Sequence, residues 1–488
     1  MTRALRILCL VVSLVAIPAA DAVAASCERE NTPIFDGGGY IYDFTATAGY
    51  GQPALGGSNG PGDIPSGPVE TTNAWGFWGN VLVFPPGADL TSPVSTNRYS
   101  GDQNGCAFPL GGQEIVYPVA PMHGLEVQHR WYVDPGPLNG ARILTVLRNP
   151  GAAPVSATLV VGDPSGFDRL GSGAETRARA TSNGTGVFSP ASYWGVSTDE
   201  GGGQDPALAH VWGAPGGAIA PSEVVLGNAF LKEILYWAWN ITVPPSQTFA
   251  FISYEVQAAV PGRNQAAEIA QAVAQAEARQ KQAPASLYLG MTRAEIAATR
   301  NWPHPPPSPA IAPVGKPNAA KPVRLNGTAS AGAAGLPQCG IASYAWKTDD
   351  GATGTAATLS HYFGPGRHTA TLTVANNCGG AKSVETTFNV ASGLKLGKVK
   401  LNRKAGTAKL QLQALGAGKL TLSGKGVKNQ AKQLKRAGKV SLTLKPTGKT
   451  LSTLRRSGKA KVRLKVALLP KGGKASRLSK AVTLKLLG

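Results

Sequence analysis

The sequence predicts a multidomain, all-β protein made of antiparallel β-sandwiches, with a short helical segment after the first sandwich. Glycine and proline are abundant, with 61 and 37 residues in a chain of 488, which suits many short strands joined by turns. Along most of the chain, apolar residues alternate with polar ones or form short apolar runs. Since one hydrophobic core rarely serves more than about 250–300 residues, this length indicates several domains.

Residues 1–25 are interpreted as a secretory signal peptide. Arg3 and Arg6 precede an apolar run over residues 7–17, and small residues that fit a cleavage site follow. The run is shorter than the ~20 apolar residues that a membrane-spanning helix needs. No later segment resembles such a helix. We therefore expect a secreted protein, extracellular or associated with the cell surface, with no transmembrane segment once the signal is removed.

Residues 26–256 predict a large β-sandwich. Segments with strand periodicity are separated by Gly, Pro, Asn or Asp, as expected for an antiparallel sandwich. They are NVLVF, QEIVYPV, GLEVQHRWYV, ARILTVLR, SATLVVG, EILYWAWNITV and FAFISYEV. The segments FDGGGYIY and LRNPGAAPVSATLVVG also resemble the N-terminal sandwich of uncharacterised secreted proteins of high-GC soil bacteria. That resemblance implies a fold and no assigned activity.

Residues 257–300 predict a helical segment that packs back on the first domain. An alanine-rich stretch over 264–282 places Ile269, Val273 and Ala276 at helical spacing. The other interpretation of this segment is a solvated spacer.

A second, shorter helix is expected within the same segment, because Thr292 and Glu295 have the spacing of a capping box. Residues 301–317 follow and are rich in proline. Proline favours an extended, semi-rigid conformation, so these residues predict a linker.

Residues 318–391 resemble the PKD domain, a small immunoglobulin-like sandwich found outside cells. The family's Trp-Asp-Phe-Gly-Asp-Gly signature stands here as WKTDDG, in which Trp346, Asp350 and Gly351 match and the residues between Trp346 and Asp350 depart. The later HYFGPGRHTATLTVAN matches the family's aromatic residue, Pro-Gly turn and Thr-x-Thr-Leu-Thr-Val strand. The resemblance implies an immunoglobulin-like fold and a spacer or binding role, without catalysis.

Residues 392–488 predict a small, lysine-rich β-sandwich. Segments such as KVKLN, AKLQLQ and KVRLKVALL place Leu or Val on one face of a strand and Lys, Arg, Thr or Ser on the other. Six such strands and a helical turn in LSTLRRSGK are expected. The region resembles the lysine-rich C-terminal module of uncharacterised secreted proteins of high-GC soil bacteria, which implies no mechanism.

The excess of positive charge is confined to this last region. From Ala391 to Gly488 there are 26 Lys and Arg and no Asp or Glu, whereas the whole chain has 48 basic and 27 acidic residues. The first 390 residues therefore hold 48 − 26 = 22 basic residues against 27 acidic ones, a balance of −5. Charge of one sign repels itself, so we expect an anionic partner to offset it. The plainer interpretation is a solubilising surface that also protects edge strands.

The expected partner is an anionic cell-envelope polymer or an acidic polysaccharide. Non-specific contact with extracellular nucleic acid is the alternative, although the region lacks Phe, Tyr and Trp for base stacking. Nothing in the sequence indicates an oligomeric state. The candidate polyanion-binding residues are Lys398, Lys400, Arg403, Lys404, Lys409, Lys419, Lys461, Arg463 and Lys465.

The four cysteines that follow the predicted signal fall into two regional pairs. In an oxidising compartment an even, paired set predicts the disulfides Cys27–Cys106 and Cys339–Cys378. Bridges between the two regions, which the proline-rich linker separates, are the alternative. Metal binding is not indicated, because no two of these cysteines lie within a few residues of each other.

The acidic turn STDEGGGQDP offers a candidate calcium site. Asp199, Glu200 and Asp205 would supply oxygen ligands, which Ca²⁺ takes from flexible loops. The alternative is an ordinary solvated turn. No other cofactor is expected.

Two aromatic clusters each have two interpretations. NAWGFWGN contains Trp75 and Trp78, and ILYWAWNI contains Trp237 and Trp239 on one face of a predicted strand. Exposed rings in a row would stack on sugars, whereas rings in a sandwich core would be buried, which is the commoner case.

No catalytic residue is assigned, since no nucleophile elbow, zinc-protease motif or phosphate loop occurs. We expect a secreted, non-catalytic surface or matrix protein, held by its basic domain to an anionic envelope polymer, with the first sandwich displayed for ligand binding. The alternative is a secreted carbohydrate-active enzyme, a glycan hydrolase or lyase with its cleft in that sandwich. Such an enzyme would take a pair of carboxylates from Glu70, Glu114, Glu126, Asp163 and Asp168.

Overall fold

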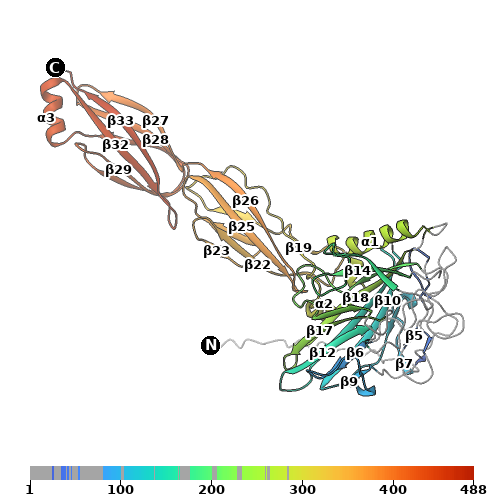
Figure 1. The fold of residues 1–488 in the computed structure, drawn as a ribbon. Coiled ribbons are helices and arrows are strands. Elements are labelled where there is room, and N and C mark those ends of the chain that lie inside the picture. Colours follow the sequence, from blue (N-terminus) through green and yellow to red (C-terminus); the bar gives the residue numbers. More distant parts are fainter. Residues whose placement is uncertain are drawn as a thin grey trace, which may run out of the picture. The chain divides into compact units, whose positions relative to one another are not determined.

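Figure 1 shows the fold of the chain as a computed structural model. The structure describes residues 25–26, 34–39, 41–42, 45–46, 53–54, 81–99, 104–136, 138–162, 164, 176–199, 206–227, 234–258, 260, 264–282 and 285–487. The chain divides into two compact units, 1–303 and 304–488, each with its own sheets. Antiparallel sheets dominate both units, so the predicted all-β, multidomain fold class is confirmed.

The first unit is a sandwich of two antiparallel sheets. The larger sheet has the order β13 (Thr176–Thr181), β14 (Trp194–Asp199), β15 (Ala207–Val211), β18 (Thr248–Ala258), β11 (Ala141–Arg148), β10 (Leu125–Val133) and β8 (Glu114–Val116), and β9 (Ala120–Met122) also pairs with β10. The smaller sheet has the order β16 (Glu223–Leu226), β17 (Leu235–Val243), β12 (Val155–Gly162) and β6 (Val81–Phe84).

Short elements complete the described part of the first unit. The paired short strands are β1 (Ala25–Ser26) with β7 (Asn104–Cys106), β2 (Ile34–Phe35) with β3 (Ile41–Tyr42), and β4 (Thr45–Ala46) with β5 (Pro53–Ala54). The single 3-10 turns are η1 (Ser95–Asn97), η2 (Leu110–Gly112) and η3 (Ala285–Tyr288).

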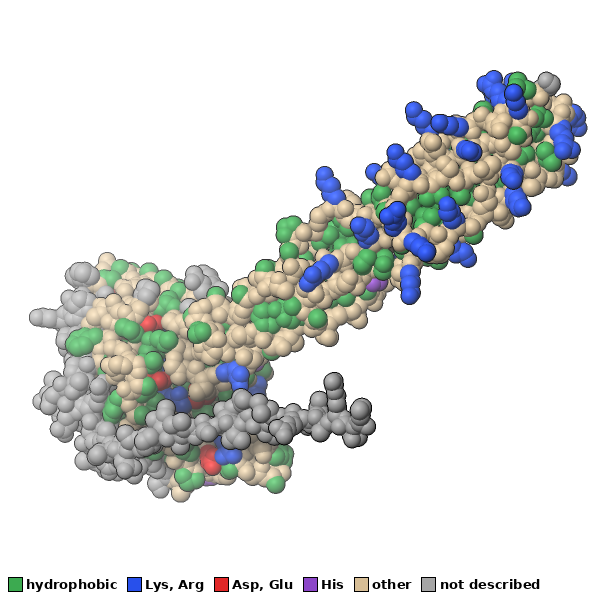
Figure 2. All heavy atoms as spheres, turned by 180° about the vertical axis from the view of Figure 1, so that it is seen from behind, with side chains coloured by type: hydrophobic (Ala, Val, Ile, Leu, Met, Phe, Trp, Pro, Cys, Tyr) green, Lys and Arg blue, Asp and Glu red, His purple; other side chains and the backbone are tan. Residues whose placement is uncertain are grey.

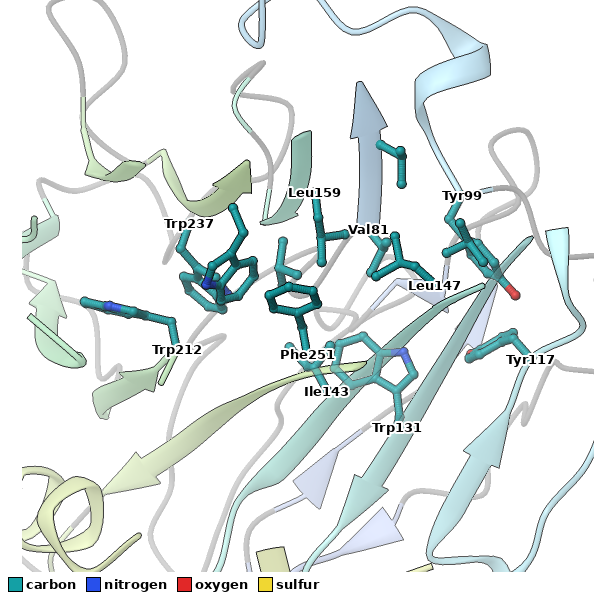
Figure 3. Close-up of a cluster of buried hydrophobic side chains, with 14 of the residues drawn as sticks. Val81, Tyr99, Tyr117, Trp131, Ile143, Leu147, Leu159, Trp212, Trp237 and Phe251 are labelled. Atoms are coloured by element: carbon teal, nitrogen blue, oxygen red, sulfur yellow. The ribbon is translucent and has the colours of Figure 1, made fainter. Parts of the chain in front are cut away.

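The main core of the first unit lies between the two sheets, and Figure 3 shows part of it. Trp131 and Phe251 come from the larger sheet, while Leu159 and Trp237 come from the smaller one. A second apolar cluster covers the other face of the smaller sheet. Burial on both faces explains why the strands of this sheet have continuous apolar runs instead of an alternating pattern.

Helix α1 (Gln265–Gln282) packs on β14, β15 and β18 of the larger sheet, and Figure 1 shows it beside β14. Its buried face contains Ala272 and Ala276 together with Glu268 and Arg279. The expected apolar face, with Ile269 and Val273, is therefore displaced by about one residue, since both of these are only half-buried. The small side chains of Ala272 and Ala276 let the helix lie close to the sheet. The longer polar side chains of Glu268 and Arg279 are accommodated beside them.

Helix α2 (Arg293–Ala298) contacts β18 and begins at the predicted capping box. The Glu295 backbone N–H donates to the Thr292 hydroxyl at 3.3 Å, and the Thr292 backbone N–H donates to the Glu295 carboxylate at 2.7 Å. Past this helix, Asn301 and Trp302 are buried against β18 by hydrogen bonds to the backbone of Ile252. The segment expected as a linker thus starts with residues that belong to the first unit.

Two buried arginines connect the helical segment to the larger sheet. Arg142 on β11 donates to the carbonyls of Leu287 and Leu289 and forms an ion pair with Glu114 at 2.9 Å. Both side chains of that pair are at most 1% exposed. Arg279 on α1 donates to two backbone carbonyls of the turn between β10 and β11. Each guanidinium donates hydrogen bonds to backbone carbonyl groups that have no partner within their own turns. Without the arginine, these carbonyls would need hydrogen bonds from water.

The second unit begins with an immunoglobulin-like sandwich. Its sheets are β23 (Thr353–Gly354), β22 (Ile341–Thr348), β25 (Gly366–Asn376) and β26 (Ala381–Val390) in that order, β20 (Val323–Asn326) with β24 (Thr358–His361), and β19 (Pro307–Ser308) with β21 (Ala331–Ala333). Trp346, Leu372 and Phe388 lie in its core. The predicted disulfide Cys339–Cys378 is confirmed, and both cysteines are fully buried.

Residues 392–487, here called the basic domain, form a second sandwich. One sheet has the order β27 (Leu394–Asn402), β28 (Thr407–Ala414) and β31 (Gly438–Leu444), and the other has β30 (Gln430–Leu434), β29 (Gly418–Ser423), β32 (Lys459–Leu469) and β33 (Ser476–Lys485). Leu, Val and Ala from both sheets fill its core. Helix α3 (Gly448–Ser457) stands where a helical turn was expected, and β30 is a strand that the sequence did not predict.

The two sandwiches of the second unit touch each other. Lys474, from the turn between β32 and β33, donates to the Asp350 carboxylate at 2.8 Å. Ala320, from the first of these sandwiches, belongs to the apolar core of the basic domain. Asp350, one of the residues that match the PKD signature, therefore also serves the contact with the basic domain.

Candidate functional site

The outward side of the sheet β30-β29-β32-β33, here called the four-stranded face, carries a straight row of cations. Along β32, exposed Lys459, Lys461, Arg463 and Lys465 alternate with buried Ala, Val and Leu. Alternate residues of a strand are about 6.6 Å apart, so this row is about 20 Å long. The register adds Lys485 opposite Lys459, Arg477 opposite Ala467 and Lys419 opposite Leu469.

The outward side of the sheet β27-β28-β31, here called the three-stranded face, carries a smaller group. Lys400 stands directly opposite Lys409, and Lys395 and Lys439 stand on either side of Gln413. All four lysines are exposed, while Leu410 and Leu412 of the central strand point into the core. The two faces lie on opposite sides of one apolar core.

The predicted polyanion-binding residues are all exposed, and the structure divides them into three groups. Lys400 and Lys409 lie on the three-stranded face, with Lys398 beside them at the irregularity in β27. Lys419, Lys461, Arg463 and Lys465 lie on the four-stranded face. Arg403 and Lys404 lie in the turn between β27 and β28. The sequence pattern does not reveal this division, because it depends on which strands share a sheet.

Both faces place like charges directly opposite each other, at Lys400–Lys409 and at Lys459–Lys485. Such cross-strand pairs oppose folding, whereas an acidic residue at one of the two positions would favour it. The basic domain has no acidic residue for this purpose. Figure 2 shows Lys and Arg side chains spread over this domain and no acidic side chain on the side in view. The charge pattern is therefore unfavourable for the stability of the free domain.

The aromatic residues of β17 do not form a sugar-binding surface. Trp237 and Trp239 are 0% exposed and lie in the core between the two sheets of the first unit. The centre of the Trp237 ring lies 5.8 Å from that of the Trp212 ring, and Figure 3 shows both side chains. The stacking interpretation is wrong for these two residues, because the strand is covered on both sides. Trp75 and Trp78 lie outside the described residues.

The candidate calcium site falls outside the described side chains. Asp199 ends β14, and Glu200 and Asp205 lie in the segment that follows, which the structure does not describe. Among the described residues, no group of three or more His, Cys, Asp or Glu is placed to hold a metal ion.

Two other predictions concern the described part of the chain. No helix there is long and apolar enough to span a membrane. Cys106 is disulfide-bonded, and its predicted partner Cys27 is not described.

A buried polar network in the larger sheet was not anticipated from the sequence. The Ser197 hydroxyl lies 2.8 Å from His210 Nε2, and His210 Nδ1 lies 2.6 Å from the Glu255 carboxylate. This is the order of groups found in serine hydrolases, but all three residues are at most 2% exposed and the Phe188 ring lies 6.0 Å from His210. The Ser197 hydroxyl is thus buried, whereas a nucleophilic serine must reach its substrate.

Burial also sets the protonation of that network. It lowers the pKa of His210 to about 3 and raises the pKa of Glu255 well above its usual range. Both changes favour the neutral forms, so the three groups form an uncharged hydrogen-bonded chain across β14, β15 and β18. The residues come from distant parts of the sequence, and only the strand register unites them.

The carboxylates considered for glycan chemistry do not form a described pair. Glu114 is buried in its ion pair with Arg142, and burial raises its pKa. Glu126 is partly exposed and pairs with Arg148 at 2.6 Å. Glu70, Asp163 and Asp168 lie outside the described residues. The two of these five carboxylates that the structure describes, Glu114 and Glu126, therefore form no facing pair.

Comparison with known proteins identifies one region. Residues 304–391 match the PKD domain family, so the match begins within the segment expected as a linker. No curated protein matches the chain. Among solved structures, a polysaccharide lyase is 10% identical to this chain with a TM-score of 0.30. The matched region covers 92% of this chain and 47% of the lyase. The chain thus spans about half the length of that lyase.

Two further solved structures are similar at lower scores. Carbohydrate-binding modules of the β-sandwich superfamily are 16% identical with a TM-score of 0.17, over 38% of this chain and 93% of the module chain. A Ca²⁺-stabilised, ice-binding adhesin of an Antarctic bacterium is 11% identical with a TM-score of 0.16, over 75% of this chain and 94% of the adhesin. Scores this low do not establish a common function. What the comparisons establish is that residues 304–391 form a PKD domain.

Proposed function

We propose that this is a secreted, non-catalytic surface or matrix protein whose basic domain binds an anionic polymer of the cell envelope. In this proposal the first unit is displayed and binds a ligand of its own. The observation that carries the proposal is the acid-free surface of residues 392–487, with like charges directly opposite each other on both sheets. A polyanion offsets this repulsion by replacing the small counterions around the lysines.

The chemistry of the surface favours a flexible, non-aromatic polymer. The region has 20 Lys and 6 Arg, and it has no Phe, Tyr or Trp. Lysine acts as a mobile point charge, whereas arginine provides the planar fork that recognises one anion geometry. Without aromatic rings the domain lacks the stacking contacts of single-strand nucleic-acid binders, worth roughly 1–3 kcal/mol per base. An acidic polysaccharide or another envelope polymer therefore fits better than a nucleic acid.

Retention on immobilised polymers tests the proposal with the full chain lacking residues 1–25. We expect retention on polygalacturonate, a carboxylate polymer, and on poly(glycerol phosphate), a phosphodiester polymer. Release should occur as salt rises to about 1 M, where the Debye length is about 3 Å. Uncharged dextran is the matched control.

The relative strength on the two polymers distinguishes a uronate-type partner from a phosphodiester one. Passage through both columns at low salt would overturn the proposal, and so would retention confined to double-stranded DNA. Sequencing of the N-terminus of the exported protein, expected at Ala25 or Ser26, tests secretion.

A further inference from the structure

We propose that one basic domain binds two polymer chains at once, one on each outer face, and so cross-links the polymer. This inference rests on the proposed polyanion binding and goes beyond it. Binding alone needs only one charged face. The structure supplies two, and they point in opposite directions.

The alternation of residues in the strands creates the two faces. On β32, Lys461, Arg463 and Lys465 point outward while Val462 and Leu464 point into the core. On the other sheet, Lys400 and Lys409 point outward while Leu410 and Leu412 enter the same core from the opposite side. Packed sheets are about 10 Å apart, so the two groups of ammonium ions lie on opposite surfaces of the sandwich.

Each face has enough charge to hold a chain by itself. The four-stranded face has seven cations, which are Lys419, Lys459, Lys461, Arg463, Lys465, Arg477 and Lys485. The three-stranded face has four, which are Lys395, Lys400, Lys409 and Lys439. Every anion neutralised by such a group adds to affinity through counterion release.

A chain bound on one face leaves the charges of the other face without an anion. Fields are screened over about 8–10 Å at physiological salt, which is close to the separation of the sheets. On one side of the sandwich, Lys480 of β33 donates to the Gly397 carbonyl of β27 at 3.2 Å, so this cation is held where the two sheets meet. The second face is therefore most simply neutralised by a second chain, and one protein molecule then joins two polymer molecules.

Light scattering of the full chain mixed with polygalacturonate tests the inference. Wild-type protein is expected to increase scattering at protein concentrations below polymer saturation. Two variants each remove four charges from one face. They are Lys395→Gln, Lys400→Gln, Lys409→Gln and Lys439→Gln on the three-stranded face, and Lys459→Gln, Lys461→Gln, Arg463→Gln and Lys465→Gln on the four-stranded face.

A control variant removes four charges outside both faces. It combines Lys425→Gln, Lys435→Gln, Arg436→Gln and Lys449→Gln, all of which are exposed in turns or on α3. If the inference is right, each one-face variant still binds the polymer at low salt but loses about tenfold or more of the scattering, because a face left with three cations or none holds a second chain too weakly to link it to the first. The control keeps most of the wild-type scattering.

Other outcomes separate this inference from the proposed function. Binding without scattering by the wild type overturns cross-linking and leaves the proposed function intact, whereas absence of binding overturns both. One-face variants that scatter as strongly as the control also overturn the inference. Sedimentation velocity of the protein alone must show a monomer, since cross-linking through a protein dimer would contradict the two-face arrangement. Circular dichroism of each variant confirms that the sheets remain folded.

Discussion

The first unit and the basic domain treat charged groups in opposite ways. In the first unit, charged side chains enter the core with fixed partners, as Arg142 does with Glu114. In the basic domain the core consists of Leu, Val and Ala, and the cations stay outside with no acidic residue in the domain to meet them. Two regions of the same fold class therefore respond to different conditions. The stability of the first unit depends on pH and on specific charged partners, and that of the basic domain depends on salt.

The largest expected effect comes from leaving a buried charge without its partner. Arg142→Met removes the guanidinium and leaves Glu114 buried, which should destabilise the first unit by about 3–5 kcal/mol. Chemical denaturation followed by tryptophan fluorescence measures this. Arg148→Met is the matched control. The side chains of Arg148 and Glu126 are 53% and 39% exposed, and an exposed ion pair is worth about 0–1 kcal/mol. Equal losses of unfolding free energy in the two variants would show that burial does not decide how much such an ion pair contributes.

The second prediction asks whether the regions are stabilised independently. Cys339→Ser opens the disulfide to Cys378, whose sequence separation is 39 residues, and should destabilise the second unit by roughly 4 kcal/mol. Differential scanning calorimetry should show the transition of the first unit unchanged. A shift of both transitions would show that the units unfold together and would weaken the comparison.

The third prediction concerns pH. His129 is buried, no hydrogen-bond partner is described for either ring nitrogen, and burial lowers its pKa to about 3. The unfolded chain takes up this proton near pH 6.5 and the folded chain does not, so stability falls as pH drops from about 6.5 towards 3. The slope per histidine is at most about 1.4 kcal/mol per pH unit.

The variant His129→Phe should reduce this acid sensitivity of the first unit, measured by urea denaturation at several pH values. Tyr117→Phe is the matched control, since its ring stacks against His129 and its hydroxyl does not titrate in this range. An unchanged pH profile for His129→Phe would mean that other groups cause the acid sensitivity. His210 acts in the same direction, because burial lowers its pKa as well.

The smallest expected effect lies in the basic domain. Lys409→Gln removes one member of the Lys400–Lys409 pair and should stabilise the domain by about 0.2–1 kcal/mol at low salt. The gain should fade as salt rises, because salt screens exposed charges. Lys435→Gln, in the exposed turn after β30, is the control. A gain in stability that does not depend on salt would mean that the strand propensity of glutamine, and not the removed charge, causes it.

The sequence predicted strands where local periodicity dominates. In β32 every second residue is apolar and buried, so both the strand and its exposed lysines followed from the pattern. Strand β30, QAKQL, has no such alternation and was missed, because its place is set by pairing with β29. The assignment of Lys409 and Lys461 to different faces also depends on pairing between segments far apart in the chain.

Long-range contacts were harder to predict than local structure. Trp237 and Trp239 share a face as expected, and of their two interpretations the buried one is correct, because both rings lie between the two sheets. His210 is isolated in the sequence, and its contacts with Ser197 and Glu255 arise from three neighbouring strands. No local signal reports such a network, since none of its members is near another along the chain.

The exposed cations of the basic domain also bear on how long the protein survives outside a cell. Each Lys or Arg is a cleavage site for trypsin-like proteases, and pairs such as Arg403–Lys404 and Lys435–Arg436 lie in turns. A protease needs an extended, accessible segment, so strand lysines are cleaved only when the sheets open, whereas turn lysines are attacked first. A polymer bound on the two faces would cover the strand lysines and leave these turns accessible, so attachment would protect the faces of the domain but not its turns.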